Sequence, residues 1–201
     1  MKFRIAVRFY PEETPLALND LHQQHAVVIA VRTAPQETRD QARLQLRRAI
    51  SHVAMSAFNC AAETVRIHSE PGKPSTLWAG ARQMYLSMSH DDGLSVAAIS
   101  LNKPVGIDIV KPNDCFEWED VAVLYLPDSS RHAISTQADA TRKRTQFYKE
   151  WTQLEARLKY TGRPLSEHSA QREAQLNAFR AHDFHRLDLT DAYIGTICIG
   201  T

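Results

Sequence analysis

The chain of 201 residues is poor in the residue types that several common kinds of site require. Its three cysteines, Cys60, Cys115 and Cys198, lie far apart and form no CxxC pair, which argues against a disulfide framework or a zinc site. With only seven glycines, the chain contains neither GxxxxGKS/T nor GxGxxG, so a glycine-rich phosphate loop is not expected. The HExxH and GxSxG motifs are also absent, which argues against a zincin-type metal site and a nucleophile elbow.

The chain also lacks an excess of charge and a long apolar run. Its 24 basic and 23 acidic residues give a net charge of +1, so no global field favours nucleic acid or a membrane surface. The segment MKFRIAVRFY alternates apolar and polar residues and lacks the apolar core of a signal peptide, and no run approaches a membrane span. We therefore expect a cytoplasmic protein with no membrane or nucleic-acid partner, in which any anion site is built locally.

Periodic patterns predict strands and helices along the whole chain. At 43% hydrophobic residues, the chain can form one globular unit or two small lobes that share a core. Residues 11–19 are expected to form a loop, and 164–179 a loop and a helix. Strands are expected at 3–9, 26–32, 64–68, 84–88, 94–101, 105–110, 182–187 and 192–199, long helices at 33–58 and 137–161, and short helices at 116–126 and 128–133.

The helix expected at 137–161 carries two neighbouring rows of side chains. One row is apolar and is typical of a buried face: Phe147, Trp151, Leu154 and Leu158. The row beside it contains Glu155 and Lys159, which places a carboxylate and an ammonium at i, i+4 on the edge of the buried face. Such a pair is either a solvated surface ion pair or the border of a cleft, and the helix alone favours the surface pair.

Two further features admit both a structural and a functional interpretation. Asp108 stands within the aliphatic strand VGIDIV, where its carboxylate must either pair with a buried cation or cap a backbone amide at the strand end. Arg39, Arg43 and Arg47 are spaced four apart on the first long helix, so they share a face that is either solvated or able to hold a phosphate.

Spacing argues against most histidine metal sites. His182 and His185 lie three apart in a predicted strand and therefore point to opposite faces, and His22 and His25 have no third ligand nearby. What remains is Ser89 and His90 at a strand end, with Asp108, Glu155 and Lys159. Two carboxylates with a lysine and a histidine suit a Mg²⁺ ion that bridges the protein and a phosphorylated substrate, as in phosphoryl transfer.

Four ordered segments carry a resemblance to a known family. They are EPGKP at Glu70 to Pro74, LSMSHDDG at Leu86 to Gly93, VGIDI at Val105 to Ile109, and FYKEWTQLEARLKYTG at Phe147 to Gly162. In these segments the chain resembles the 4′-phosphopantetheinyl transferases of the larger, pseudodimeric (surfactin-synthetase-activating type) class. Members of this class modify carrier proteins of fatty-acid, polyketide and nonribosomal peptide synthesis.

The resemblance implies a Mg²⁺-dependent enzyme that transfers the 4′-phosphopantetheine group of coenzyme A to a serine of an apo acyl or peptidyl carrier protein and releases 3′,5′-ADP. It assigns catalysis to Glu155, Asp108 and Lys159, with Glu155 taking the serine proton, and it assigns the metal to Asp108 and Glu155. It assigns binding of the coenzyme A phosphates to Arg43, Lys73, Ser89, His90 and Lys159.

The resemblance also predicts the architecture. The expected fold is α+β, a pseudodimer of two similar lobes, residues 1–103 and 104–201, each with a long helix packed on a small, mainly antiparallel sheet. The active site would lie in the cleft between the lobes, and because one chain supplies both halves of the site, a monomer is expected.

Three positions depart from the family pattern. Val110 replaces a second acid that often binds the metal, Leu154 replaces a lysine, and residues 125–130 do not keep the usual Phe-Ser-x-x-Glu. These departures leave open an alternative, a weakened or inactive member that binds coenzyme A or a carrier protein without turnover. A nucleic-acid patch on the arginine face is a third interpretation, and the balanced net charge argues against it.

Overall fold

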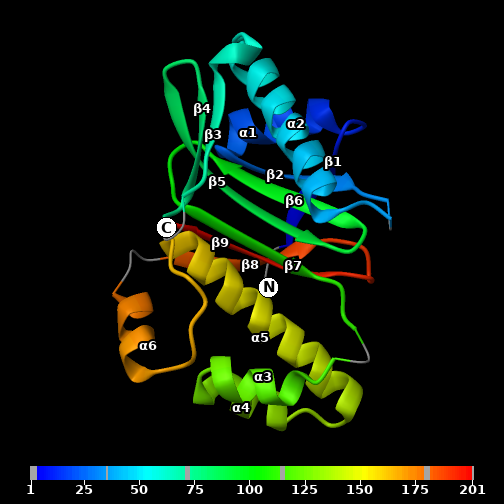
Figure 1. Ribbon diagram of the computed structural model, residues 1–201, viewed down its shortest axis with the longest axis vertical. Helices are drawn as coiled ribbons and strands as arrows, with labels where there is room; N and C mark the ends of the chain where they lie inside the picture. The colour runs from blue at the N-terminus through cyan, green and yellow to red at the C-terminus, as the bar shows by residue number, and fades with distance from the viewer. Residues whose placement is uncertain (1–3, 35, 71–72, 114–115, 179–181, 201) are drawn as a thin grey trace.

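The computed structural model describes residues 4–34, 36–70, 73–113, 116–178 and 182–200 (Figure 1). Cys115, and Pro71 and Gly72 of the predicted turn, lie outside the described residues. The first half of the chain contains β1 (Arg4–Phe9), α1 (Thr14–Gln24), β2 (Ala26–Arg32), α2 (Arg39–Phe58), a short 3-10 turn (Ala62–Thr64), β3 (Val65–His68), β4 (Ser75–Ala79), β5 (Arg82–Asp91) and β6 (Leu94–Ser100).

The second half begins with an edge strand and is richer in helix. It contains β7 (Val105–Val110), α3 (Trp118–Tyr125), α4 (Asp128–Ser135), α5 (Ala140–Thr161), α6 (Ala170–Asn177), β8 (His182–Asp188) and β9 (Ile194–Gly200). Of the expected α+β fold, the combination of helices with strands is confirmed, and so are both long helices.

The strands form one nine-stranded mixed sheet in the order β3-β4-β5-β6-β2-β1-β8-β9-β7. Strand β1 pairs in parallel with β2, where Val7 lies opposite Val28, and with β8, where Ile5 lies opposite Leu187. The other six pairings are antiparallel. Strand β1 therefore joins the strands of the first half to those of the second in a single sheet.

The sheet curves back so that its end strand, β7, meets β5. The backbone N–H of Ile107 donates to Ser87 Oγ at 3.0 Å, and the N–H of Ile109 donates to Ser89 Oγ at 3.3 Å. Serine hydroxyls thus satisfy the backbone donors that an unpaired edge strand would leave open. The inside of the curve is filled by aliphatic side chains, among them Val96, Ala98, Ile107, Ile109 and Ile197.

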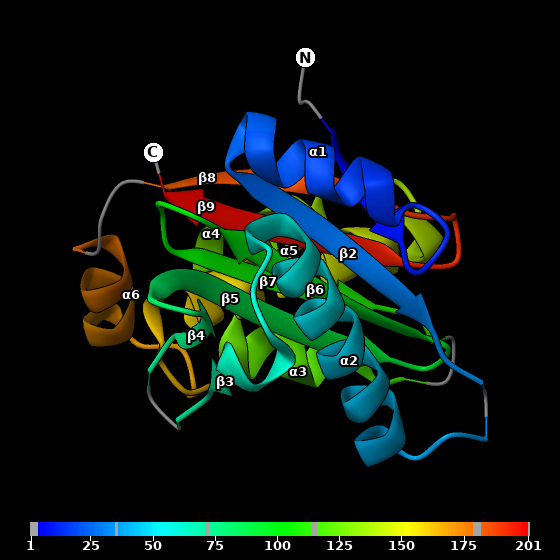
Figure 2. The ribbon, with the colours of Figure 1, turned by 90° about the horizontal axis from the view of Figure 1, so that it is seen from above.

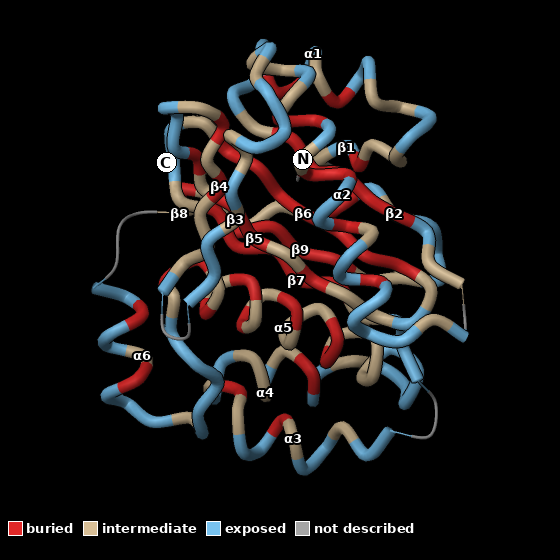
Figure 3. The backbone as a smooth tube through the Cα atoms, turned by 45° about the horizontal axis from the view of Figure 1, so that its top comes forward, coloured by how far each residue is buried: buried red, intermediate tan, exposed pale blue. Residues whose placement is uncertain are grey.

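Two helical layers cover the outer faces of the sheet. Helices α1 and α2 pack on β2, β4, β5 and β6, and seen from above they lie over the sheet with α5 on its far side (Figure 2). Helix α5 lies between the sheet and the smaller helices α3, α4 and α6, which cover its other side. Buried residues gather in the strands and in α5, whereas α3 and α6 are exposed on their outer sides (Figure 3).

Two sequence predictions about these elements were wrong or incomplete. The loop expected at 11–19 is largely α1, because Pro15 occupies the first turn of the helix, where a missing N–H is tolerated, and Ala17 and Leu21 are buried. Strand β4, STLWA, was not predicted, since only two of its five residues, Leu77 and Ala79, are buried, and it is held by pairing with β3 and β5.

Candidate functional site

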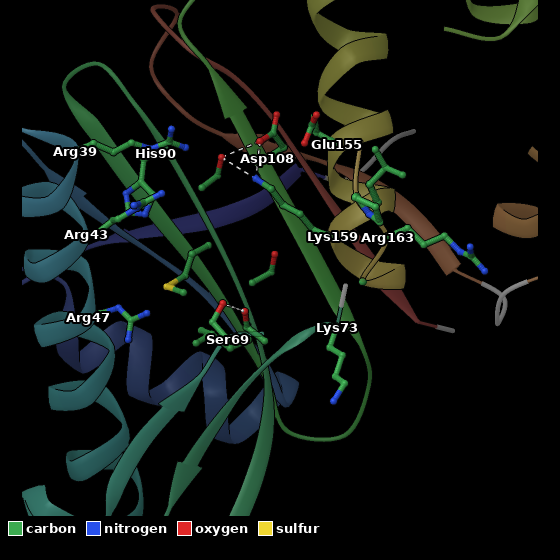
Figure 4. A pocket seen from close by; sticks show the side chains of 18 residues that line it. Arg39, Arg43, Arg47, Ser69, Lys73, His90, Asp108, Glu155, Lys159 and Arg163 are labelled. Carbon is green, nitrogen blue, oxygen red and sulfur yellow. Dashed lines mark hydrogen bonds and ion pairs between the residues drawn. The ribbon is translucent and has the colours of Figure 1, made fainter. Parts of the chain in front are cut away.

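A cleft of about 780 Å³ lies between α2, β5, β7 and α5, and we call it the central cleft (Figure 4). Every residue assigned a role from the sequence lines it: Arg43, Lys73, Ser89, His90, Asp108, Glu155 and Lys159. The cleft also receives Arg39, Arg47 and Arg163, so six cationic side chains and two carboxylates share one hollow. A chain of nearly zero net charge therefore concentrates positive charge at one place.

Close packing of α5 on β7 sets the positions of the two carboxylates. A Cβ atom on Gly106 would lie 1.9 Å from the backbone oxygen of Ala156 and 2.5 Å from the nitrogen of Tyr160, so only glycine allows the helix to approach this strand. On the neighbouring strand β9, the hydroxyl of Thr196 lies 2.8 Å from that of Thr152 on α5. This contact surface holds the helical row of Glu155 and Lys159 against the strand that carries Asp108.

Asp108 is the centre of a buried hydrogen-bond network. Its Oδ1 accepts a hydrogen bond from Ser89 Oγ at 2.8 Å and an ion pair from Lys159 Nζ at 2.8 Å. Lys159 Nζ also donates to Ser89 Oγ at 3.1 Å. Of the two interpretations left open by the sequence, the structure therefore gives Asp108 a cation partner, supplied from another element by the tertiary fold.

Glu155 is held in a different state from Asp108. Within the described residues its carboxylate has no hydrogen bond or ion pair, and the surface pair with Lys159 is not formed because the lysine turns to Asp108. Burial raises the pKa of Glu155, the nearby charge of Asp108 raises it further, and Lys159 lowers it. A desolvated carboxylate that lacks an internal donor is suited to accept a proton or to bind a cation.

The opposite wall of the cleft is a row of arginines. Arg39, Arg43 and Arg47 extend from α2 toward the hollow (Figure 4). Arg43 has an exposed contact of 3.4 Å with Asp40, whereas Arg39 and Arg47 have no hydrogen bond or ion pair to another described residue. Their helix is fixed by a capping box in which Thr38 and Gln41 exchange hydrogen bonds.

His90 lies beside this arginine row. Its pKa is lowered from 6.5 to about 4, chiefly by burial and in addition by the charges of Arg43, Arg39, Lys159 and Arg47. The ring is therefore neutral at pH 7, and its Nδ1 lies 2.9 Å from the hydroxyl of the buried Ser95. This contact orients the ring and leaves Nε2 as the second polar atom that a ligand could meet.

Lys73 stands apart from the rest of the site. It lines the rim of the cleft, but its Nζ pairs with Glu70 at 2.7 Å and both side chains are largely exposed. Figure 4 shows the ammonium pointing away from the other labelled cations. The structure thus brings six of the seven predicted residues together and leaves Lys73 at the edge, with its charge already matched.

Sequence reasoning did not include Arg39, Arg47 and Arg163 among the site residues. The spacing of four residues between the arginines on α2 did place Arg39 and Arg47 on the same face as Arg43, so the signal was present in the sequence. Arg163 follows the end of α5, and its guanidinium donates to Gln175 Oε1 at 2.7 Å. No local pattern marks it, because only the turn after Gly162 brings it to the cleft.

A second pocket, of about 460 Å³, adjoins the central cleft, and we call it the side pocket. Arg39, His90, Asp108 and Glu155 line both hollows, so Glu155 stands where the two meet. Val110 is half-buried and lines the side pocket with Asp108 and Glu155. Leu154, the other departure, is buried against α3, α4 and α6 and does not line either hollow.

The protein supplies only part of a coordination shell for Mg²⁺. The carboxylates of Asp108 and Glu155 line the same cleft and offer hard oxygen ligands. Ser89 and Lys159 both bind Oδ1 of Asp108, so Oδ2 is the oxygen that Asp108 could offer to a metal ion. Among the described residues, no group of three or more histidine, cysteine, aspartate or glutamate side chains could hold a metal ion. Mg²⁺ commonly takes one or two carboxylates and completes its shell with water and phosphate, so this pair fits an ion that arrives with a phosphorylated ligand.

Comparisons with known proteins add no family. No protein-family model matches the chain, and no curated protein matches its sequence. None of the helices in the described part of the chain combines the length and the apolar character needed to cross a bilayer.

Proposed function

We propose that the protein is a 4′-phosphopantetheinyl transferase, which moves the phosphopantetheine group of coenzyme A to a serine of an apo acyl or peptidyl carrier protein. One observation carries the proposal above the others. The desolvated carboxylate of Glu155, which pairs with none of the described residues, stands beside the Asp108–Lys159 pair, at the end of a cleft whose other wall is a row of arginines. The resemblance of the four sequence segments points to the same reaction.

Coenzyme A is an anion that suits this cleft. Arg43, with Arg39 and Arg47 beside it, can hold the 3′-phosphate, and Lys159 with the neutral His90 can meet the pyrophosphate. Guanidinium groups bind phosphate oxygens in pairs, and the partial burial of the site keeps solvent from screening them. Lys73 can join them only by leaving Glu70.

Glu155 acts as the general base in this proposal. The serine hydroxyl enters through the side pocket and gives its proton to the Glu155 carboxylate. The serine oxygen then forms a bond to the β-phosphorus of coenzyme A, and the anhydride bond to the α-phosphate breaks. Both electrons of that bond leave with 3′,5′-ADP, whose charge Lys159 and the arginine row stabilise.

Asp108 and Glu155 would hold the Mg²⁺ ion, which supplies Lewis-acid stabilisation of the charge on the pyrophosphate. Ser89 positions Asp108 through the hydrogen bond to Oδ1. With Val110 in place of a third acid, the protein contributes two carboxylates, and water and phosphate oxygens are expected to fill the remaining positions.

The proposal extends to the architecture and to the partner. We propose that the two halves of the chain, residues 1–103 and 104–201, are the lobes of a pseudodimer that acts as a monomer in the cytoplasm. In it α2 supplies the arginine wall, and α5 with β7 supplies the carboxylate wall of a single site. The partner is a carrier protein, with no nucleic acid and no membrane.

A transfer assay tests the proposal. Purified protein is incubated with fluorescent coenzyme A, Mg²⁺ and a panel of apo carrier proteins, and labelling is followed by gel fluorescence and mass spectrometry. We expect labelling by the wild type and by Glu119→Gln, an exposed change on α3, and none by Glu155→Gln. If no carrier is labelled although coenzyme A still binds, the protein is not a transferase but a coenzyme A-binding protein.

A further inference from the structure

The Lys159 ammonium binds one of the two carboxylate oxygens through which Asp108 could hold a metal ion. Its Nζ lies 2.8 Å from Asp108 Oδ1, and Ser89 Oγ donates to the same oxygen. The side chains are 30% exposed for Lys159 and 9% exposed for Asp108, so solvent screens this pair less than a surface ion pair. In this arrangement Asp108 already has its charge compensated without any divalent cation.

Glu155 cannot offer the ion a complete alternative. Its carboxylate is a single unpaired ligand, and the described residues contain no third acidic, histidine or cysteine side chain that completes a site. A divalent cation that enters the cleft without a phosphate must therefore stay close to Lys159 and repel it, or displace it from Asp108. Like charges at such short range are unfavourable where solvent screening is weak.

An anion changes this balance. Lys159 also lines the cleft that holds the arginine row, so a phosphate there offers its ammonium a second partner. Once Lys159 turns to the phosphate, Asp108 is an uncompensated buried carboxylate next to Glu155. Two adjacent carboxylates then favour a divalent cation strongly, since it neutralises both.

We propose that Lys159 acts as an internal cation on Asp108, so that the site binds a divalent metal ion only together with, or after, a phosphate ligand. The inference rests on the proposed function for the identity of that ligand, a pyrophosphate-containing nucleotide. It adds an order of binding, phosphate before or with metal, and it assigns the order to one side chain.

Mn²⁺ binding measured by electron paramagnetic resonance tests the inference without any turnover. We expect Lys159→Met to raise the affinity for Mn²⁺ alone by about tenfold or more, because a charge-assisted partner of Asp108 is lost. The gain in Mn²⁺ affinity that coenzyme A confers on the wild type should shrink in this variant. Circular dichroism verifies that each variant is folded.

Two matched variants separate the Lys159 contact from a general loss of positive charge. Arg163→Met removes one cation from the same cleft, where the guanidinium is bonded to Gln175, and should change the affinity for Mn²⁺ alone by less than about twofold. Lys159→Arg keeps a cation near Asp108 and should keep the low affinity of the wild type. Inorganic pyrophosphate serves as a second anion in every measurement.

Two results would overturn the inference. The first is that Lys159→Met has the same affinity for Mn²⁺ alone as the wild type. The second is that neither coenzyme A nor pyrophosphate changes the affinity of the wild type for Mn²⁺. Because no carrier protein is present, the measurement is independent of the transfer assay. Transfer without this coupling would remove only the inference, whereas coupling without transfer would remove only the proposed function.

Discussion

At the scale of single residues, the ionised carboxylate of Glu155 lowers the stability of the folded protein. Its raised pKa means that the folded protein disfavours the ionised carboxylate that a neutral solution imposes. Sites that work on substrates commonly retain such an unfavourable charge, and its removal stabilises the protein while it ends activity.

We therefore expect Glu155→Gln to abolish transfer and to raise the free energy of unfolding at pH 7 by about 1 kcal/mol. The amide keeps the shape of the side chain but needs no desolvation of a charge. Urea unfolding followed by circular dichroism gives the stability, and the fluorescent assay gives the activity. A variant that is less stable than the wild type would show that Glu155 has a stabilising partner instead.

The same group fixes the sign of a pH dependence. Because the folded-state pKa of Glu155 lies above its ordinary 4.5, its contribution to stability is present below pH 4.5 and is lost as pH rises through the folded value. The stability advantage of Glu155→Gln should therefore be small at pH 4 and grow toward neutrality. Transfer should fall on the acid side as Glu155 becomes protonated, which a pH profile of the initial rate would show.

His90 gives the opposite sign. Its pKa falls from 6.5 to about 4 in the folded protein, so stability from this group is present above pH 6.5 and is lost progressively as pH falls toward 4. The stability of His90→Gln should depend less on pH across that window than the stability of the wild type. Parallel pH profiles of the two proteins in urea measure the difference, and identical slopes would contradict the assignment.

At the scale of secondary-structure elements, the approach of α5 to β7 depends on one glycine. Gly106→Ala should lower the free energy of unfolding by roughly 3 kcal/mol, because its Cβ would overlap the backbone of Ala156 and the helix must move. Thermal and urea unfolding would measure the loss, with Gly200→Ala as the comparison, because a Cβ atom there would meet its nearest neighbours only at 3.4 Å or more. Wild-type stability in Gly106→Ala would mean that the helix can shift freely.

Strand β7 offers a second test, at its last position. Val110 lines the side pocket beside Asp108 and Glu155, so Val110→Glu should add a third carboxylate and tighten Mn²⁺ binding in the presence of coenzyme A by about tenfold. Val110→Gln serves as the control, because glutamine is nearly the same size as glutamate but carries no charge. A loss of stability with no gain in metal affinity would mean that position 110 faces the core.

At the scale of the whole molecule, β1 connects the two halves of the chain. It pairs with β2 on one edge and with β8 on the other, so the strands of both halves form one continuous sheet. A second link joins the halves at the loops, where the hydroxyl of Tyr193 donates to the backbone oxygen of Asp92 at 2.6 Å.

We therefore expect a single unfolding transition in urea. In Trp78→Phe the remaining tryptophans, Trp118 and Trp151, report only on the second half, whereas circular dichroism reports on the whole chain. Midpoints from the two probes should coincide within error. Separate midpoints would show that residues 1–103 and 104–201 unfold as independent lobes.

The elements that were predicted well are those whose signal is local. Alternation and short apolar runs located β2, β6 and β7, and helical spacing located α2 and α5. The same spacing placed Glu155 and Lys159 on one edge of a helix and Arg39, Arg43 and Arg47 on one face of another. Periodicity depends only on the direction in which successive side chains point, so the sequence was enough.

The sequence by itself thus determined that helices and strands combine in this fold, where the long helices lie, and which rows of charge they carry. Only the tertiary structure decided which charges meet: Lys159 pairs with Asp108, 51 residues away, rather than with Glu155 one turn before it. It also placed Lys73 at the rim and brought Arg163 into the cleft. Such partners are set by the packing of distant elements around residues such as Gly106. A pattern along the chain carries no information on how far apart in space two side chains lie when they belong to different elements.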